Sequence, residues 1–370
     1  MHNKIDNKYI GNAIDELSNL LGVREEAPTK MILKPFQHGK IGESIEAIAN
    51  YLGLPVAVNL SYVPSTYRQG NSENRFESSD LATKDSTGRG VEGITAQVSI
   101  PSFIPLYGAS KLQNFTVNVK ISDNCRKYPQ TFVTIMAHEL SHILLHSLRH
   151  KEKNNEFYAD LTAMILGFSK VTWIGRKVVE TRKKLFSIET LTTTYGYLTD
   201  EQFNFAYDKI IEIRKNSINL KKKLRKMLPA YREQLYSCRK ELFRFEKYME
   251  YLDENKNRAI RKEDTPKIIL FHKPDYADEF TAIIRINEER LEATNAFCAS
   301  PIHYTPMKLN SLYEEIRTSI HDLREQFDLL HKDVWILRKY VGTHHRNIVD
   351  RQFILQDKQD KIVGPESYLH

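Results

Sequence analysis

Cysteine is scarce in this chain of 370 residues, and long hydrophobic runs are missing. Only Cys125, Cys238 and Cys298 occur, and none of them forms a CxxC pair. This excludes a disulfide framework and a cysteine-rich zinc ribbon, and it favours a reducing compartment. No stretch approaches the roughly 18 consecutive apolar residues of a spanning helix, and the N-terminus lacks the apolar core of a secretory signal. We therefore expect a cytoplasmic protein without a membrane partner.

A strong charge of one sign is also missing. The 54 basic and 47 acidic residues give a formal net charge of +7, which is a mild basic excess and much less than a polybasic nucleic-acid-binding tail would contribute. Basic residues do cluster at 221–226, but no aromatic residues interleave them, so we interpret this segment as a solvated helix face. Nucleic acid is not expected as a direct ligand. Apolar residues make up 41% of the chain, which is enough to build a folded core.

The composition changes near residue 200. Charged residues occupy 43 of the first 200 positions and 58 of the last 170, a rise that is typical of exposed helices after a globular domain. The length alone favours two domains. We predict an α+β domain over residues 1–200, with its core at about 40–170, and a mostly helical domain over residues 201–370.

Hydrophobic periodicity predicts alternating helices and strands in the first half. A helix over residues 43–53 would place Ile45, Ile48, Ala49 and Leu52 on one stripe. Residues 64–92 are rich in Ser, Gly, Asn and charge, so we expect a surface loop there. The remaining predictions are strands over 54–63, 93–100 and 114–121, and helices over about 129–150 and 155–168.

The second half carries two long apolar seams. Apolar residues recur at spacings of three and four over 220–252 and over 312–341, in heptad-like order with charged flanks. Pro229 predicts a kink or break in the first seam. Residues 261–277 contain two prolines and are expected to form a connector before a further helix over about 278–298. Helix packing explains both seams, and a homo-oligomer or a partner protein bound through this half is the alternative.

The sharpest signal is the segment HELSH at residues 138–142. On a helix, His138 and His142 project from one face about one turn apart, so both imidazoles can reach a single metal ion. Glu139 lies beside that site, where it can take a proton from metal-bound water. The surrounding sequence is apolar, and a buried helix holds ligands rigidly. The alternative is a core helix that carries two histidines by chance and buries their polar atoms at a cost.

A third ligand has to come from outside this turn. Glu156 follows His142 by 14 residues, at the start of the next predicted helix. A short connection can fold that helix back across the first, which makes Glu156 the best candidate. Asp160 lies one turn further along, where it can accept the outer N–H of a liganding histidine. Taken alone, both acids also fit a solvated helix N-terminus.

His146 and His150 extend the same four-residue series. Successive members lie about 6 Å apart along the helix axis, whereas zinc–nitrogen bonds are about 2.1 Å long, so one ion cannot bind three of them. His142 and His146 can form a pair in principle, but no glutamate lies between them to act as a base. We expect His146 to pack behind the site or to face a polar neighbour, and His150 to lie at the helix C-terminus.

The runs SIEAIANYLGLPVAV, FTVNVKIS and TFVTIMAHELSHILLH, followed by NEFYAD, resemble zinc peptidases of the ImmA/IrrE type. NEFYAD is also similar to the ExxA(N/D) segment of CAAX-processing and HtpX-like proteases. The resemblance covers roughly residues 40–170 and implies a zincin-like fold. It implies that His138, His142 and Glu156 bind zinc and that Glu139 is the catalytic base. Ser141 stands where that family frequently has glycine, and the helical half has no counterpart there.

These observations predict a zinc-dependent metallopeptidase that hydrolyses peptide bonds of an intracellular protein. Zn²⁺ is the expected cofactor, zinc-bound water the nucleophile and Glu139 the general base. Tyr195, Tyr197 and His303 are candidate donors to the oxyanion, although a structural role is expected first for each. Two alternatives are a catalytically silent zincin-fold sensor or adaptor, and a helical scaffold protein with a structural metal.

Overall fold

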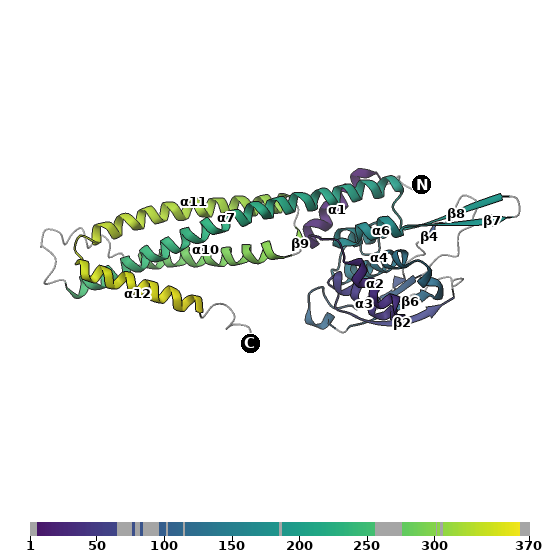
Figure 1. Cartoon of the computed structure of the whole chain (residues 1–370), viewed down its shortest axis with the longest axis horizontal. Coiled ribbons are helices and arrows are strands. Elements are labelled where there is room, and N and C mark those ends of the chain that lie inside the picture. The colour runs from purple at the N-terminus through teal and green to yellow at the C-terminus, as the bar shows by residue number, and fades with distance from the viewer. Residues whose placement is uncertain are drawn as a thin grey trace. The chain divides into compact units, whose positions relative to one another are not determined.

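A computed structural model describes most of the chain, and in it the protein is a mixed α+β molecule (Figure 1). It separates into unit 1, which comprises Met1–Ile218 and Pro301–Lys308, and unit 2, which comprises Asn219–Ser300 and Leu309–His370. The boundary suggested by composition lies after residue 200, whereas the units separate after Ile218, inside one continuous helix. The described residues are 6–64, 76–77, 82–83, 96–100, 103–113, 115–184, 187–255, 276–300, 302–303 and 306–362.

Unit 1 begins with three helices, α1 (Asn7–Leu21), α2 (Thr29–Gln37) and α3 (Ile41–Tyr51). The side chain of Asp6 accepts a hydrogen bond from the Tyr9 N–H over 2.8 Å and caps α1. The stripe predicted for residues 43–53 lies on α3 and is buried, which confirms that prediction. No element was predicted over residues 1–42, where α1 and α2 lie.

A four-stranded sheet packs against α3 and against the later helix α4 (Pro129–Ser147). Its order is β2 (Ala57–Val63), β6 (Thr116–Ser122), β5 (Ala96–Ile100) and β3 (Phe76–Glu77), with β2 and β6 parallel and the other pairs antiparallel. The three predicted strands are therefore confirmed. Strand β2 begins at Ala57 rather than at Leu54, because Pro55 has no N–H to donate to a neighbouring strand.

The predicted surface loop over residues 64–92 is wrong at four positions. Strand β3 lies within it, and so does β4 (Ala82–Thr83), which pairs with a later hairpin. Apart from these two strands and Pro64, the range lies outside the described residues. Such two-residue strands carry too little sequence pattern to be recognised by alternation.

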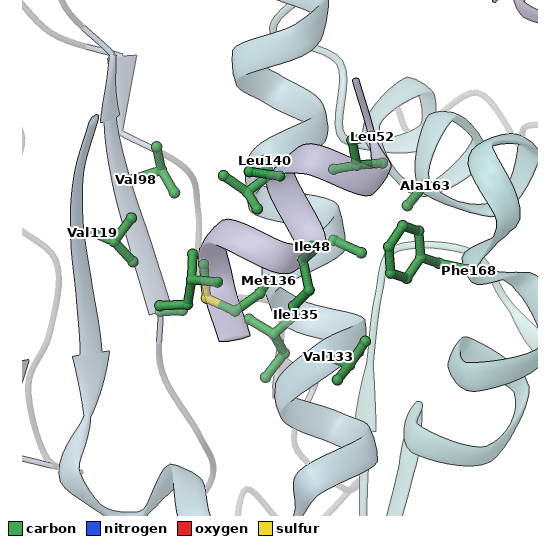
Figure 2. Packing of buried hydrophobic residues seen from close by; sticks show 14 of the residues in the cluster. Ile48, Leu52, Val98, Val119, Val133, Ile135, Met136, Leu140, Ala163 and Phe168 are labelled. Atoms are coloured by element: carbon green, nitrogen blue, oxygen red, sulfur yellow. The ribbon is translucent and has the colours of Figure 1, made fainter. Parts of the chain in front are cut away.

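Helix α4 (Pro129–Ser147) runs through the middle of unit 1, and 16 of its 19 residues are buried. Pro129 occupies the first turn, where a missing N–H costs nothing. A helix that is apolar on all sides must be covered on all sides. Figure 2 shows that cover gathered around α4, from strands β5 and β6 and helix α3, with Met136, Leu140, Val98, Val119 and Ile48 in one cluster.

The helix predicted over 155–168 is present but does not end as a regular helix. It comprises α5 (Glu156–Ala163) and a π-helical segment (Met164–Phe168), and α6 (Ser169–Gly175) follows directly. Gly167 has a φ of +101°, and a Cβ there would approach the Glu25 carbonyl oxygen to 2.2 Å. The Gly167 carbonyl accepts from the Ala27 N–H over 2.7 Å. Only glycine allows this close approach between the π-helical segment and the residues before α2.

Two smaller sheets complete unit 1. Strands β7 (Lys177–Lys184) and β8 (Ser187–Tyr195) form an antiparallel hairpin that was not predicted, and β4 pairs with β8 on its other edge. Strand β1 (Val23–Arg24) pairs with β9 (Ile302–His303). Short 3₁₀ turns occur at Ser110–Leu112 and Asp123–Lys127.

Unit 2 is helical, as predicted, and its helices run alongside one another in Figure 1. It contains most of α7 (Asp200–Glu254), α10 (Tyr276–Ala299), most of α11 (Pro306–Leu337), and α12 (Thr343–Ile362). Helix α7 continues through Pro229, so the break is wrong, and of the predicted kink or break only a kink stays a prediction. Leu228 and Tyr231 on either side are buried, and their packing offsets the cost of an interior proline. Helix α12 was not predicted. Residues 261–275 of the expected connector lie outside the described residues, and α10 begins at Tyr276.

Within the described part of the chain, no helix is both long enough and apolar enough to cross a membrane.

Candidate metal centre

The histidines of the HELSH segment and Glu156 converge on one point. His138 and His142 lie one turn apart on α4, and Glu156 is the first residue of α5. The Nε2 atoms of the two histidines are 3.3 Å apart, and Oε2 of Glu156 lies 3.1 Å from Nε2 of His138 and 3.0 Å from Nε2 of His142. Among the described residues, these three side chains form the one group of His, Cys, Asp and Glu that could hold a metal ion.

The spacing of these three atoms fits a tetrahedral zinc site. With bonds of about 2.0–2.1 Å, neighbouring ligands of a tetrahedral zinc ion lie about 3.4 Å apart. The observed separations of 3.0–3.3 Å are slightly shorter than these edges. Two nitrogens and one carboxylate oxygen also match the donor set of catalytic zinc sites, which keep the fourth position open. The residues present therefore fit zinc.

Both histidines turn their Nδ1 atoms away from Glu156 and onto hydrogen-bond acceptors. The Nδ1–H of His138 donates to Oδ1 of Asp160 over 2.7 Å, and the Nδ1–H of His142 donates to the Lys153 carbonyl over 3.3 Å. In a neutral ring that carries its proton on Nδ1, Nε2 presents a lone pair. Three electron-rich atoms then face one another at about 3 Å, which is favourable only with a positive charge among them.

The pKa values of the metal-free site reflect the same demand for positive charge. Burial opposes protonation of His138, but the charge and hydrogen bond of Asp160, together with Glu156, outweigh it and raise the pKa to about 10. Burial also raises the pKa of Glu156, yet the hydrogen bonds from His138 and His142 hold it well below its usual range. In the metal-free protein a proton on His138 supplies the positive charge that a metal cation would supply between the three ligand atoms.

Glu139 and Asp160 flank the three converging groups. Glu139 lies between the histidines on α4 and is completely buried, and its charge contributes to the raised pKa of His138. Asp160 lies one turn along α5 and binds His138 directly, as the sequence predicted. Glu156 is the most accessible of the three candidate ligands, with 18% of its side chain exposed, so solvent reaches the site from its side.

The two further histidines of the series do not join the site. Nε2 of His146 lies 2.8 Å from Oδ1 of Asn154, the polar neighbour that was expected. Burial lowers the pKa of His146 to about 4, so its ring is neutral at pH 7. His150 lies beyond the end of α4, 3.5 Å from Glu16, with its ring against Tyr158.

The candidate oxyanion donors lie in different places. The Tyr197 ring stacks on the His138 ring, with centroids 5.8 Å apart and an angle of 22° between the planes. Tyr195 is buried at the end of β8. His303 lies in β9, paired with Val23 of β1. Tyr197 is therefore the candidate that the structure brings into contact with a candidate ligand.

Sequence reasoning missed the groups that hold the outer part of the site. One is the Lys153 carbonyl, which accepts from His142. The others are the backbone N–H groups of Tyr197 and Leu198, which donate to Oδ2 of Asp160 over 2.7 and 3.3 Å. Backbone donors leave no mark in a sequence. The single available signal was Gly196 between two tyrosines, which indicates a turn.

Comparison of the chain with protein-family models, with curated proteins and with solved structures finds no match.

Proposed function

We propose that this protein is a zinc-dependent metallopeptidase with a zincin-like catalytic domain in unit 1, which hydrolyses peptide bonds of an intracellular protein. The observation that carries the proposal is the convergence of Nε2 of His138, Nε2 of His142 and Oε2 of Glu156 within 3.3 Å of one another. The three buried cysteines carry no disulfide, which fits a reducing compartment.

Each residue of the site has a role in this chemistry. His138, His142 and Glu156 would hold the ion, which acts as a Lewis acid and makes water a nucleophile at neutral pH. Glu139 lies beside the site, where its carboxylate can accept a proton from the attacking water and pass it to the leaving amine. Asp160 keeps the His138 proton on Nδ1 and so leaves Nε2 available.

Substitution of Glu139 by Gln tests the catalytic part of the proposal. The change keeps the shape of the side chain and removes the base, so we expect about one zinc per chain to be retained and peptide cleavage to be lost. New protein N-termini should be compared between cells that express the wild type and cells that express Glu139→Gln. The matched control is Glu43→Gln, an exposed glutamate of α3 that pairs with Lys40, and it should cleave like the wild type.

Other outcomes support the other functions. Identical N-termini in wild-type and Glu139→Gln cells, with zinc bound in both proteins, would overturn the peptidase and favour a silent sensor or adaptor. A wild-type protein that stays free of zinc when zinc is supplied would overturn the metal site itself. The helical unit 2 would then be left as a scaffold for a partner protein or a second copy.

A further inference from the structure

The Asp160 carboxylate is held on both of its oxygens. Oδ1 accepts from the His138 Nδ1–H over 2.7 Å, while Oδ2 accepts from the backbone N–H groups of Tyr197 over 2.7 Å and Leu198 over 3.3 Å. Hydrogen bonds from backbone donors fix a carboxylate in position. The turn that follows strand β8 therefore determines where Asp160 presents its other oxygen to His138.

Gly196 gives this turn its shape. Its φ of +97° lies in the region that other residues avoid, and an added Cβ would lie 3.2 Å from Oδ2 and 3.5 Å from Oδ1 of Asp160. The contact with Oδ2 is tighter than an ordinary van der Waals separation, whereas the contact with Oδ1 is ordinary, so a side chain at this position would require Oδ2 to move by a few tenths of an ångström. Glycine at position 196 therefore permits both the positive φ of the turn and the close approach of Asp160 without strain.

Arg176 holds the same turn at both of its ends. Its carbonyl accepts from the Tyr195 N–H over 2.7 Å, and its Nη2 donates to the Leu198 carbonyl over 2.7 Å. The guanidinium is buried, with the residue 5% exposed, and lies 4.4 Å above the Phe203 ring and 3.4 Å from Asp200. These contacts restrict the side chain to one arrangement, so the turn has a rigid support.

The space on this side of His138 is too small for a substrate. A cavity of about 10 Å³ is lined by His138, Asp160, Arg176 and Gly196 among others, which is about the volume that one water molecule needs. A peptide cannot enter it. The residues that line this cavity therefore do not contact a substrate there, and the group of the metal site that they can position is His138.

We propose that Gly196 and Arg176 are positioning residues of the metal centre, which act on metal binding by holding Asp160 against His138. The inference rests on the metal site of the proposed function. The loss of an outer hydrogen-bond partner of a metal ligand typically weakens metal binding about 10- to 100-fold. Because Gly196 acts one step further out than Asp160, we expect Gly196→Ala to weaken zinc binding by about tenfold, at the lower end of this range.

The test measures zinc affinity by chelator competition and the absorption spectrum of the cobalt-substituted protein, so that no substrate is needed. Gly108→Ala is the matched control, because Gly108 also has a positive φ, +80°, but no described atom lies within 4 Å of an added Cβ. Both variants carry the same kind of backbone strain, whereas only Gly196→Ala should bind zinc more weakly and shift the cobalt spectrum.

A double-mutant cycle with Asp160→Ala separates positioning from general destabilisation. If Gly196 acts through Asp160, Gly196→Ala should cost affinity in the wild-type background and nothing further in Asp160→Ala. An equal loss in both backgrounds would overturn the inference, as would wild-type affinity in Gly196→Ala, while the proposed function would stand. Absence of zinc from the wild type would overturn both.

Variants of Arg176 repeat the test at a second position. Arg176→Met removes the donor to the Leu198 carbonyl and should weaken zinc binding by about tenfold, again without further effect in Asp160→Ala. Arg176→Lys keeps the charge and one donor and should recover part of the affinity. These variants decide the question if Gly196→Ala does not accumulate as folded protein. Wild-type affinity in Arg176→Met would overturn the role of Arg176.

Discussion

His138 donates its Nδ1–H to Asp160 over 2.7 Å, and this bond determines which ring nitrogen faces Glu156. With one proton fixed on Nδ1, the nitrogen left to bind a cation, either a proton or a metal ion, is Nε2, which lies 3.1 Å from Oε2 of Glu156. A histidine with the opposite tautomer would present an N–H at the same place and could not bind a cation. Asp160 on α5 therefore determines which nitrogen of His138, on α4, is available to bind a cation.

Asp160→Asn should weaken metal binding without unfolding the protein. The amide can still accept from His138, but it lacks the negative charge that polarises the ring, so we expect a loss of about 10- to 100-fold in zinc affinity. Chelator competition measures it. Asp15→Asn is the control, because Asp15 is an exposed acid of α1 that pairs with Lys209. Equal zinc affinity in the two variants would contradict the role of Asp160.

The raised pKa of His138 makes both stability and metal binding depend on pH. The folded pKa of about 10 lies above the value of about 6.5 for a free imidazole. The protonated ring therefore stabilises the metal-free protein fully below pH 6.5, and this contribution is lost as the pH rises through 10.

Zinc needs the neutral ring, so zinc binding should release a proton within this window. We expect about one proton per ion at pH 7.5, and an affinity that rises with pH. Calorimetry in two buffers of different ionisation enthalpy measures the proton count. A count of zero at pH 7.5, or an affinity that stays constant from pH 6.5 to 8.5, would show that His138 carries no proton in the metal-free protein.

Helix α1 should contribute to the stability of unit 1 through one face only. Leu17 is completely buried, whereas Leu20 on the same helix is 52% exposed. We expect Leu17→Ala to lower the free energy of unfolding by about 2–5 kcal/mol and Leu20→Ala by no more than about 0.5 kcal/mol. Urea unfolding followed by circular dichroism measures both. Equal losses would mean that α1 does not pack as described.

Pro229 should reduce the stability of α7 even though the helix continues through it. An interior proline removes one hydrogen bond and crowds the preceding turn, which costs about 3 kcal/mol relative to alanine. We expect Pro229→Ala to raise the free energy of unfolding by up to about 3 kcal/mol. Pro306→Ala is the control, because Pro306 is the first residue of α11, where proline is tolerated. An unchanged or lower stability in Pro229→Ala would contradict this account.

Elements with a strong period were predictable from sequence. The apolar stripe on α3, the alternation in β6 and the continuous apolar run of α4 each predict the element that the structure contains. The hairpin of β7 and β8 was not recognised, because charged and threonine residues fill it. Pro229 misled because local propensity is weaker than the packing of Leu228 and Tyr231.

The inner part of the site was predictable, and its outer part was not. The spacing of His138 and His142 on a helix places both on one face, and a short connection returns Glu156 to them. The donors to Asp160, by contrast, lie 37 and 38 residues further along the chain and are backbone groups. Only tertiary structure brings such groups together.

Zinc content tests the central claim most directly. Wild type, His142→Ala and His321→Ala should be loaded with zinc, freed of excess metal and measured by elemental analysis; His321 is the control, since it is exposed on α11. The account predicts about one zinc per chain in the wild type and in His321→Ala, and a sharp fall in His142→Ala. A wild type without zinc, or a His142→Ala protein that holds as much as the wild type, would contradict it.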